Sequence, residues 1–185
     1  MLNHKPLDMT IKSTGDAGLV EQAGKRAYYE LEKLSADFRK EKSTLGLPAT
    51  RMTDWIASDP VVAHEKISRA IELTRKYLPV IAAWNKRSHD ALVGLPVTAW
   101  TRDHLLKGLD YSIHQDASLA ERDLNWDIKV KLETDSMARD LIKSQGKYRF
   151  ENGKLLFDDS EALKAYQSHI AAVDKLVSEA EKFKK

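Results

Sequence analysis

Apolar residues recur every three or four positions along most of the chain. This spacing places them on one side of an α-helix, where they can face a core. The pattern holds over residues 17–42, 60–92, 101–144 and from 160 towards the end. The sequence therefore predicts four long helices, and in the first of them the apolar stripe consists of Leu19, Ala23, Ala27, Leu31, Leu34 and Phe38.

Two similar segments separate the first three helices. Both contain Gly-Leu-Pro, at 46–48 and at 94–96, and both are followed by threonines. Glycine favours the left-handed conformation that ends a helix, and proline prevents the helix from continuing. The similarity indicates either an internal duplication or the same helix-ending solution found twice.

Capping residues predict where the helices begin. Asp16 is expected to cap the first helix, Ser58 or Asp59 the second, and Thr98 or Thr101 the third. Pro60 is preset for a first helical turn. Asp158, Asp159 or Ser160 would cap the last helix. Residues 1–16 are polar and aperiodic, which predicts a flexible N-terminal arm followed by a single helical-bundle domain over 17–185.

A β-hairpin is predicted just before the last helix. Asn152-Gly153 lies between two short alternating runs, which is typical of a two-residue hairpin turn. The expected cross-strand pairs are Tyr148 with Phe157, Phe150 with Leu155, and Glu151 with Lys154. Because an isolated hairpin is marginally stable in water, its apolar face should lie on the helices or on a partner.

The third helix has two apolar faces, and residues 115–118 are the expected place for a bend. Either this helix is the central element of a bundle, or its second face binds a partner or a ligand. In the partner interpretation the interface consists of Leu119, Trp126, Val130 and Met137 from the helix with Tyr148, Phe150, Leu155 and Phe157 from the hairpin. The predicted fold is all-α, an up-and-down bundle of four main helices with one β-hairpin before the C-terminal helix.

Composition narrows the function classes. The 185 residues carry 30 Lys+Arg against 28 Asp+Glu, so a dedicated nucleic-acid surface is not indicated. The absence of cysteine excludes disulfides, thiol nucleophiles and thiolate metal sites. Apolar runs are only a few residues long, so no transmembrane segment is expected. The opening residues do not predict a signal peptide. The location stays open between the cytoplasm and, if a signal sequence was removed, the periplasm or cell envelope.

Residues that could carry chemistry are sparse. No nucleophile-elbow, zinc-protease, EF-hand or dinucleotide-binding motif occurs. Asp110 and His114 are one helical turn apart, which suits either an ordinary intrahelical pair or half of an acid-base or metal site. Together with Trp84 and Trp100 they are the candidate lining of an interhelical pocket. No cofactor and no metal site are expected.

The hairpin and last helix show a spacing of Asn152-Gly153, Phe157, Ser160, Tyr166 and Ile170. This spacing resembles the C-terminal end of an uncharacterised family of small helical lipoproteins of Gram-negative bacteria. The resemblance implies a location in the cell envelope and no particular activity.

These observations favour a non-enzymatic protein that acts through protein-protein interaction or self-association. The expected partner is another protein or a second copy of the chain, because the third helix and the hairpin offer surplus apolar surface. Two alternatives stay open: a small-molecule binder or enzyme with an interhelical pocket, and a bacterial cell-envelope protein of unknown role.

Overall fold

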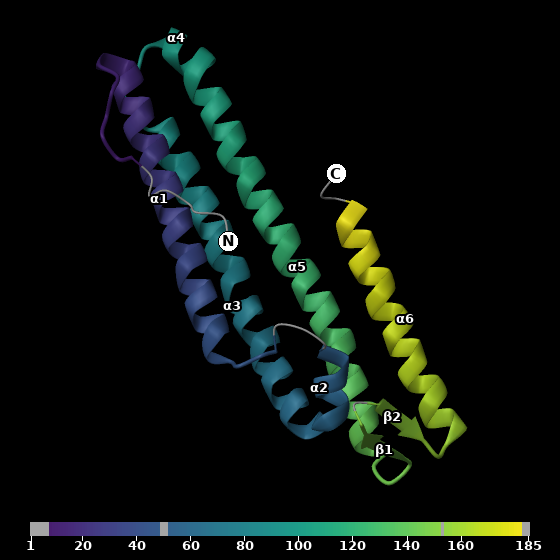
Figure 1. Ribbon diagram of the computed structural model, residues 1–185. Coiled ribbons are helices and arrows are strands. Elements are labelled where there is room, and N and C mark those ends of the chain that lie inside the picture. The colour runs from purple at the N-terminus through teal and green to yellow at the C-terminus, as the bar shows by residue number, and fades with distance from the viewer. Residues whose placement is uncertain (1–7, 49–51, 153, 183–185) are drawn as a thin grey trace. The chain divides into compact units, whose positions relative to one another are not determined.

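The computed structural model describes residues 8–48, 52–152 and 154–182, and 81% of these described residues are helical (Figure 1). Four long helices and a hairpin before the last one confirm the predicted all-α class. In chain order the elements are α1 (Gly15–Thr44), α2 (Met52–Ser58), α3 (Pro60–Val93), α4 (Ala99–Thr101), the π-helical segment η1 (Arg102–Leu106), α5 (Lys107–Lys143), β1 (Tyr148–Glu151), β2 (Lys154–Phe157) and α6 (Ser160–Lys182).

Most of the predicted helix starts are confirmed by capping bonds. Asp59 Oδ1 accepts from the Val62 N–H at 3.1 Å, and Asp159 Oδ1 accepts from the Ala162 N–H at 2.8 Å. Thr98 caps α4, since its hydroxyl oxygen accepts from the Thr101 N–H. Each bond satisfies a backbone donor that the first turn of a helix leaves free.

The two Gly-Leu-Pro segments differ in backbone conformation. Gly46 has φ +59°, as expected for a left-handed helix end. Gly94 does not share this conformation: its N–H donates to the Asp90 carbonyl at 3.1 Å, the bond of a continuing helix. The prediction that both helices end in the same way is therefore wrong at the second segment. Residues 49–51 of the first segment, and Gly153 of the hairpin turn, lie outside the described residues.

One further expectation is corrected. Asp16 does not precede the first helix, because α1 already begins at Gly15, and the Asp16 carboxylate accepts from the Thr98 N–H instead. At 115–118, where a bend was predicted, α5 continues as an unbroken helix. The helix is irregular at η1, shortly after its N-cap Thr98. A π-helical turn contains about one more residue than an α-helical turn, so it changes the direction in which the following side chains point.

The chain divides into two compact units, each described here by itself. Unit 1 comprises the residues up to Lys40 together with Tyr77–Asp123. Its core contains Trp84 and Ile113, both fully buried. The Trp84 Nε1–H donates to the Ala27 carbonyl at 3.0 Å, which fixes the indole between α1 and α3. Gly24 allows α1 and α5 to pack closely, because a Cβ atom there would lie 3.0 Å from a Leu109 methyl carbon.

Unit 2 comprises Glu41–Lys76 and the residues from Leu124 onward. Its core includes Ile56, Ile67 and Met137, which are at most 1% exposed. The hairpin has the predicted antiparallel register, with Tyr148 opposite Phe157, Phe150 opposite Leu155, and Glu151 opposite Lys154. Strand β2 contacts both α2 and α6. The prediction of a single domain over 17–185 stays a prediction.

Candidate interaction surface

Of the predicted interface residues of α5 in unit 2, Trp126 bonds to α6 and Met137 lies beside residues of α6. The Trp126 Nε1–H donates to the Leu176 carbonyl at 3.0 Å, and Met137 is fully buried. Val130 is half-buried on the same helix. A helix face that is covered by a neighbour from the same chain needs no second partner. In unit 2 the second apolar face of α5 therefore contributes to the core.

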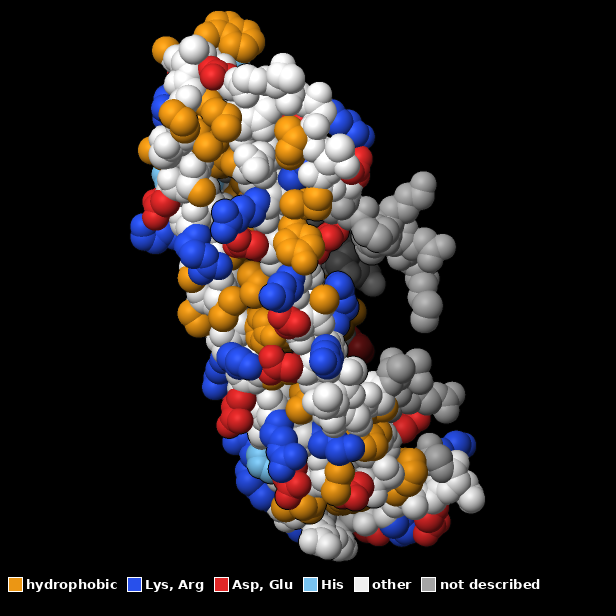
Figure 2. Space-filling view, turned by 90° about the vertical axis from the view of Figure 1, so that its left-hand side faces the viewer, with side chains coloured by type: hydrophobic (Ala, Val, Ile, Leu, Met, Phe, Trp, Pro, Cys, Tyr) orange, Lys and Arg blue, Asp and Glu red, His pale blue; other side chains and the backbone are white. Residues whose placement is uncertain are grey.

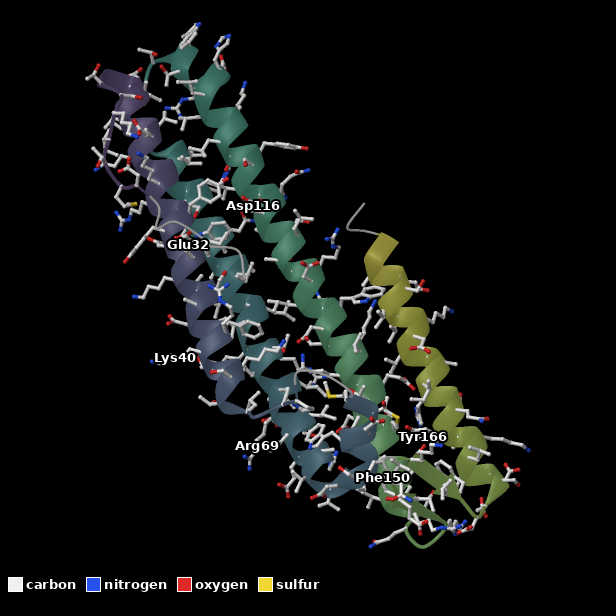
Figure 3. All side chains as sticks on the ribbon, viewed as in Figure 1. Glu32, Lys40, Arg69, Asp116, Phe150 and Tyr166 are labelled. Atoms are coloured by element: carbon white, nitrogen blue, oxygen red, sulfur yellow. The ribbon has the colours of Figure 1, made fainter. Side chains whose placement is uncertain are left out.

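The hairpin side chains are also engaged within unit 2. Tyr148, Phe150, Leu155 and Phe157 are all half-buried, on one face of the two strands. The Phe157 ring lies 5.4 Å from the Tyr166 ring of α6 and 5.8 Å from Tyr148, distances typical of aromatic pairs. Figure 3 shows Phe150 on β1 and Tyr166 on the part of α6 nearest the hairpin. Burial raises the pKa of both Tyr148 and Tyr166, as expected for phenols inside an apolar cluster.

Leu119, the predicted interface residue in unit 1, is exposed. It is 45% accessible, and Tyr111, two turns earlier on α5, is 66% accessible. Gln115 lies between them, and its amide donates to the Tyr111 hydroxyl at 3.0 Å. We call Tyr111, Gln115 and Leu119 the α5 outer face. Sequence reasoning missed Tyr111, although its spacing of four and eight from the other two places all three on one side of a helix.

A second exposed aromatic residue lies where α4 leads into η1. Trp100 is 63% accessible, and its indole stacks on the His104 ring with centroids 4.7 Å apart and planes inclined by 13°. The His104 Nδ1–H donates to the Trp100 carbonyl at 2.8 Å, which holds the two rings together. We call this pair the Trp100 turn. π-Helical turns inside longer helices are frequent at functional sites.

Hydrogen bonds to other segments of unit 1 hold the backbone of the Trp100 turn in place. One Asp16 carboxylate oxygen accepts from the Thr98 N–H at 2.7 Å and from the Thr101 hydroxyl at 3.0 Å. Arg102 donates to the carbonyls of Val93 at 2.9 Å and Leu95 at 3.1 Å. The bonds from Thr98 lower the pKa of Asp16. These long-range bonds carry no periodic signal, so the sequence did not reveal them.

The predicted pocket residues have different surroundings. Trp84 is in the core of unit 1, whereas Trp100 is exposed. Asp110 accepts from the His89 Nδ1–H at 2.9 Å and 3.0 Å, and His114 Nδ1 accepts from the Asn85 amide at 3.0 Å. Both pairs link α3 to α5, so the side chains of Asp110 and His114 join two helices of unit 1.

A serine, an aspartate and a histidine meet in unit 2. Asp135 Oδ1 accepts from the His64 Nδ1–H at 2.7 Å and from the Ser68 hydroxyl at 3.3 Å. In a hydrolytic triad the serine is bonded to the imidazole that removes its proton. Here the Ser68 hydroxyl is bonded to the carboxylate instead, and Arg139 also pairs with that carboxylate at 3.1 Å. The arrangement neutralises a buried aspartate and ties α3 to α5.

His169 forms the clearest charged cluster. Its two ring nitrogens donate to Glu133 at 2.6 Å and to Asp140 at 3.0 Å. Burial disfavours the charged ring, but the bonds to Asp140 and Glu133 outweigh this effect and raise the pKa of His169. Hydrogen bonds from His169 and Lys143 in turn lower the pKa of Asp140. The cluster is therefore an ionic clamp between α5 and α6.

A buried lysine lies on the opposite side of α5. Lys131 pairs with Asp127, which also accepts from the Thr74 hydroxyl at 2.9 Å and pairs with Lys42 at 3.5 Å. The Lys131 side chain is only 8% exposed. Burial lowers the pKa of Lys131 against the opposing effect of Asp127. A buried charge of this kind is tolerated because its partner is within hydrogen-bonding distance.

Metal binding and membrane insertion receive no support from the described residues. Among them, no group of three or more His, Cys, Asp or Glu side chains is arranged to hold a metal ion. Within that same part of the chain, each helix is too short or too polar to cross a bilayer. Comparison with protein-family models, curated proteins and solved structures finds no match to this chain. The resemblance to the lipoprotein family stays a prediction.

Proposed function

We propose that this protein is a non-enzymatic interaction protein that binds a second copy of itself through the Trp100 turn and the α5 outer face. The single observation that carries the proposal is Trp100, a tryptophan 63% exposed on a turn whose backbone is held by Asp16, Thr98 and Arg102. A large aromatic side chain on a fixed backbone loses little conformational entropy when it is buried by a partner.

The residue types support a contact surface. Tryptophan and tyrosine are enriched among the residues that contribute most to protein interfaces. Trp100 and Tyr111 each expose more than 60% of their surface, and Leu119 adds an aliphatic contact on the same helix as Tyr111. Figure 2 shows hydrophobic side chains at the end of the molecule where α4 lies.

Charge supports a second copy as the partner. The chain carries a formal net charge of +2, so two copies repel one another only weakly. On the face seen in Figure 2, Lys and Arg side chains are interspersed with Asp and Glu, without a large field of one sign. A symmetric pair would bury the same residues on both copies, so each exposed aromatic side chain would count twice.

Light scattering over a concentration series tests the proposal. The unmodified protein should show twice the monomer mass, and the double variant Trp100→Ser with Tyr111→Ser should show the monomer mass. The matched control is Val61→Ser with Val177→Ser, which replaces two exposed apolar residues of unit 2 that are 53% and 45% accessible. This control should remain dimeric.

Two results would overturn the proposal. One is a strict monomer at every concentration of the unmodified protein. The other is equal dissociation of the test and control variants, because this would show that general surface polarity, and not the Trp100 turn and α5 outer face, governs association. Circular dichroism should show the same helix content for all three proteins.

A further inference from the structure

Unit 1 contains a groove of about 410 Å³ between α1 and α3, helices that lie side by side in Figure 1. It is separate from the Trp100 turn and the α5 outer face, which belong to other elements. Volumes of a few hundred Å³ are typical of sites for small organic molecules. The residues around this groove indicate which class of molecule would fit.

Small side chains create the groove. Ala23 and Ala27 of α1 and Ser88 and Ala91 of α3 line it. Where two helices present alanine and serine to each other, their side chains are too short to fill the space between the backbones. Leu19 and Leu95 also contribute to the lining, so these residues together form an apolar part of the wall.

Charged side chains form the rim. Arg26 Nε lies 3.4 Å from Glu30 Oε1, and Arg87 Nη2 lies 4.0 Å from Glu30 Oε2. One carboxylate thus lies between two guanidinium groups, which leaves one positive charge in excess at the rim. Each guanidinium has five N–H donors in a planar fork, and these match the two oxygens of a carboxylate.

A polar group also lies deeper in the groove. Ser88 is 6% exposed and is one of the lining residues. A serine hydroxyl can both donate and accept a hydrogen bond. A ligand in the groove would therefore meet a hydrogen-bonding group beside the apolar part of the wall.

We propose that the α1–α3 groove binds a small organic carboxylate with a compact apolar body. The apolar body would lie against Ala23, Ala27 and Ala91, and the carboxylate would accept hydrogen bonds from Arg26 and Arg87 at the rim. Ser88 would bond a polar atom of the body. Both charge and shape contribute, so neither an uncharged analogue nor a small inorganic anion should bind as well.

The probe is 4-phenylbutyrate, titrated into the full chain by isothermal calorimetry, with 4-phenylbutyramide as the uncharged analogue. We expect saturable binding of one acid per chain and an amide affinity lower by about tenfold or more, since hydrogen bonds to charged groups are roughly twice as strong as neutral ones. Backbone amide shifts measured by NMR should change in residues 19–30 and 87–95. No saturable binding, or equal binding of acid and amide, would overturn the proposal.

Three variants locate the site. Arg87→Gln should lower the affinity for the acid by about tenfold and leave the affinity for the amide unchanged. Ala91→Phe should fill the groove and abolish binding of both probes. Ala91 is exposed, so this variant should keep its fold, which circular dichroism would verify. The matched control is Arg69→Gln, an exposed arginine of α3 in unit 2, and it should bind both probes normally. Normal binding by Ala91→Phe would overturn the proposal.

Discussion

Both halves of α5 carry large apolar side chains on a second face, but these side chains have different surroundings in the two units. In unit 2, Trp126 and Met137 are covered by α6, and Met137 is fully buried. In unit 1, Tyr111 and Leu119 remain 66% and 45% exposed. The difference shows that an apolar stripe on a helix predicts burial without saying what buries it. Whether the stripe is buried within the chain depends on whether another helix or strand packs against it.

The largest expected effect is at Met137. Met137→Ala should reduce the free energy of unfolding by about 2 to 5 kcal/mol, because it removes a fully buried side chain and leaves a cavity. Urea unfolding followed by circular dichroism measures the change. A loss of less than about 0.5 kcal/mol would show that α6 does not cover this face in solution.

The next effect concerns the clamp around His169. His169→Gln should cost about 1 to 3 kcal/mol at mildly acidic pH, because the charged ring donates to two carboxylates. The folded-state pKa of His169 is raised, so its stabilising contribution is fully present below the ordinary histidine pKa of about 6.5 and is lost as the pH rises through the raised value.

The measurement for this prediction is the urea midpoint between mildly acidic and mildly alkaline pH. The unmodified protein should lose stability towards alkaline pH more steeply than His169→Gln. Equal slopes for the two proteins would contradict the clamp. His89→Gln is the matched control, since it removes a histidine that contacts a single carboxylate in unit 1.

A smaller effect is expected at the base of the Trp100 turn. Asp16→Ala removes the acceptor of two hydrogen bonds and should lower the stability of this turn, by less than the loss of the His169 clamp because Asp16 is on the surface. Hydrogen exchange of the backbone amides at 98–106 should become faster, while exchange in unit 2 should not change. Unchanged exchange at 98–106 would show that other contacts fix the turn.

The smallest effect is expected on the α5 outer face. Tyr111→Ser should change the free energy of unfolding by no more than about 0.5 kcal/mol, because the side chain is mostly solvated in the folded state. The measurement is the urea midpoint at a concentration where the protein is monomeric. A loss above about 1 kcal/mol would show that this face is covered within one chain, which would remove the contrast between the two halves of α5.

Local signals made much of the fold predictable. The hairpin register followed from Asn152-Gly153 and the alternation around it, and the cap at Asp59 followed from residue type and position. The similar Gly-Leu-Pro segments led to the wrong prediction that both helices end in the same way. A glycine permits the left-handed conformation without requiring it, and the Gly94 N–H makes a further helical hydrogen bond.

The candidate sites were less predictable because they depend on contacts between distant residues. Asp110 was expected to interact with its neighbour one turn away, and instead it bonds His89 on another helix. His169 has partners 36 and 29 residues away in sequence, and no periodicity predicts such distances. The α1–α3 groove depends on which alanines face each other, and this is fixed only when the two helices pack.

The buried amine of Lys131 offers a practical use. Acylating reagents react with neutral lysine amines that they can reach, and this side chain is 8% exposed beside Asp127. In the folded protein it should be acylated far more slowly than surface lysines such as Lys143, whose side chain is 75% exposed. The acylation rate at this single position would then report how often unit 2 opens, and mass spectrometry of one peptide could measure that rate without any substitution in the chain.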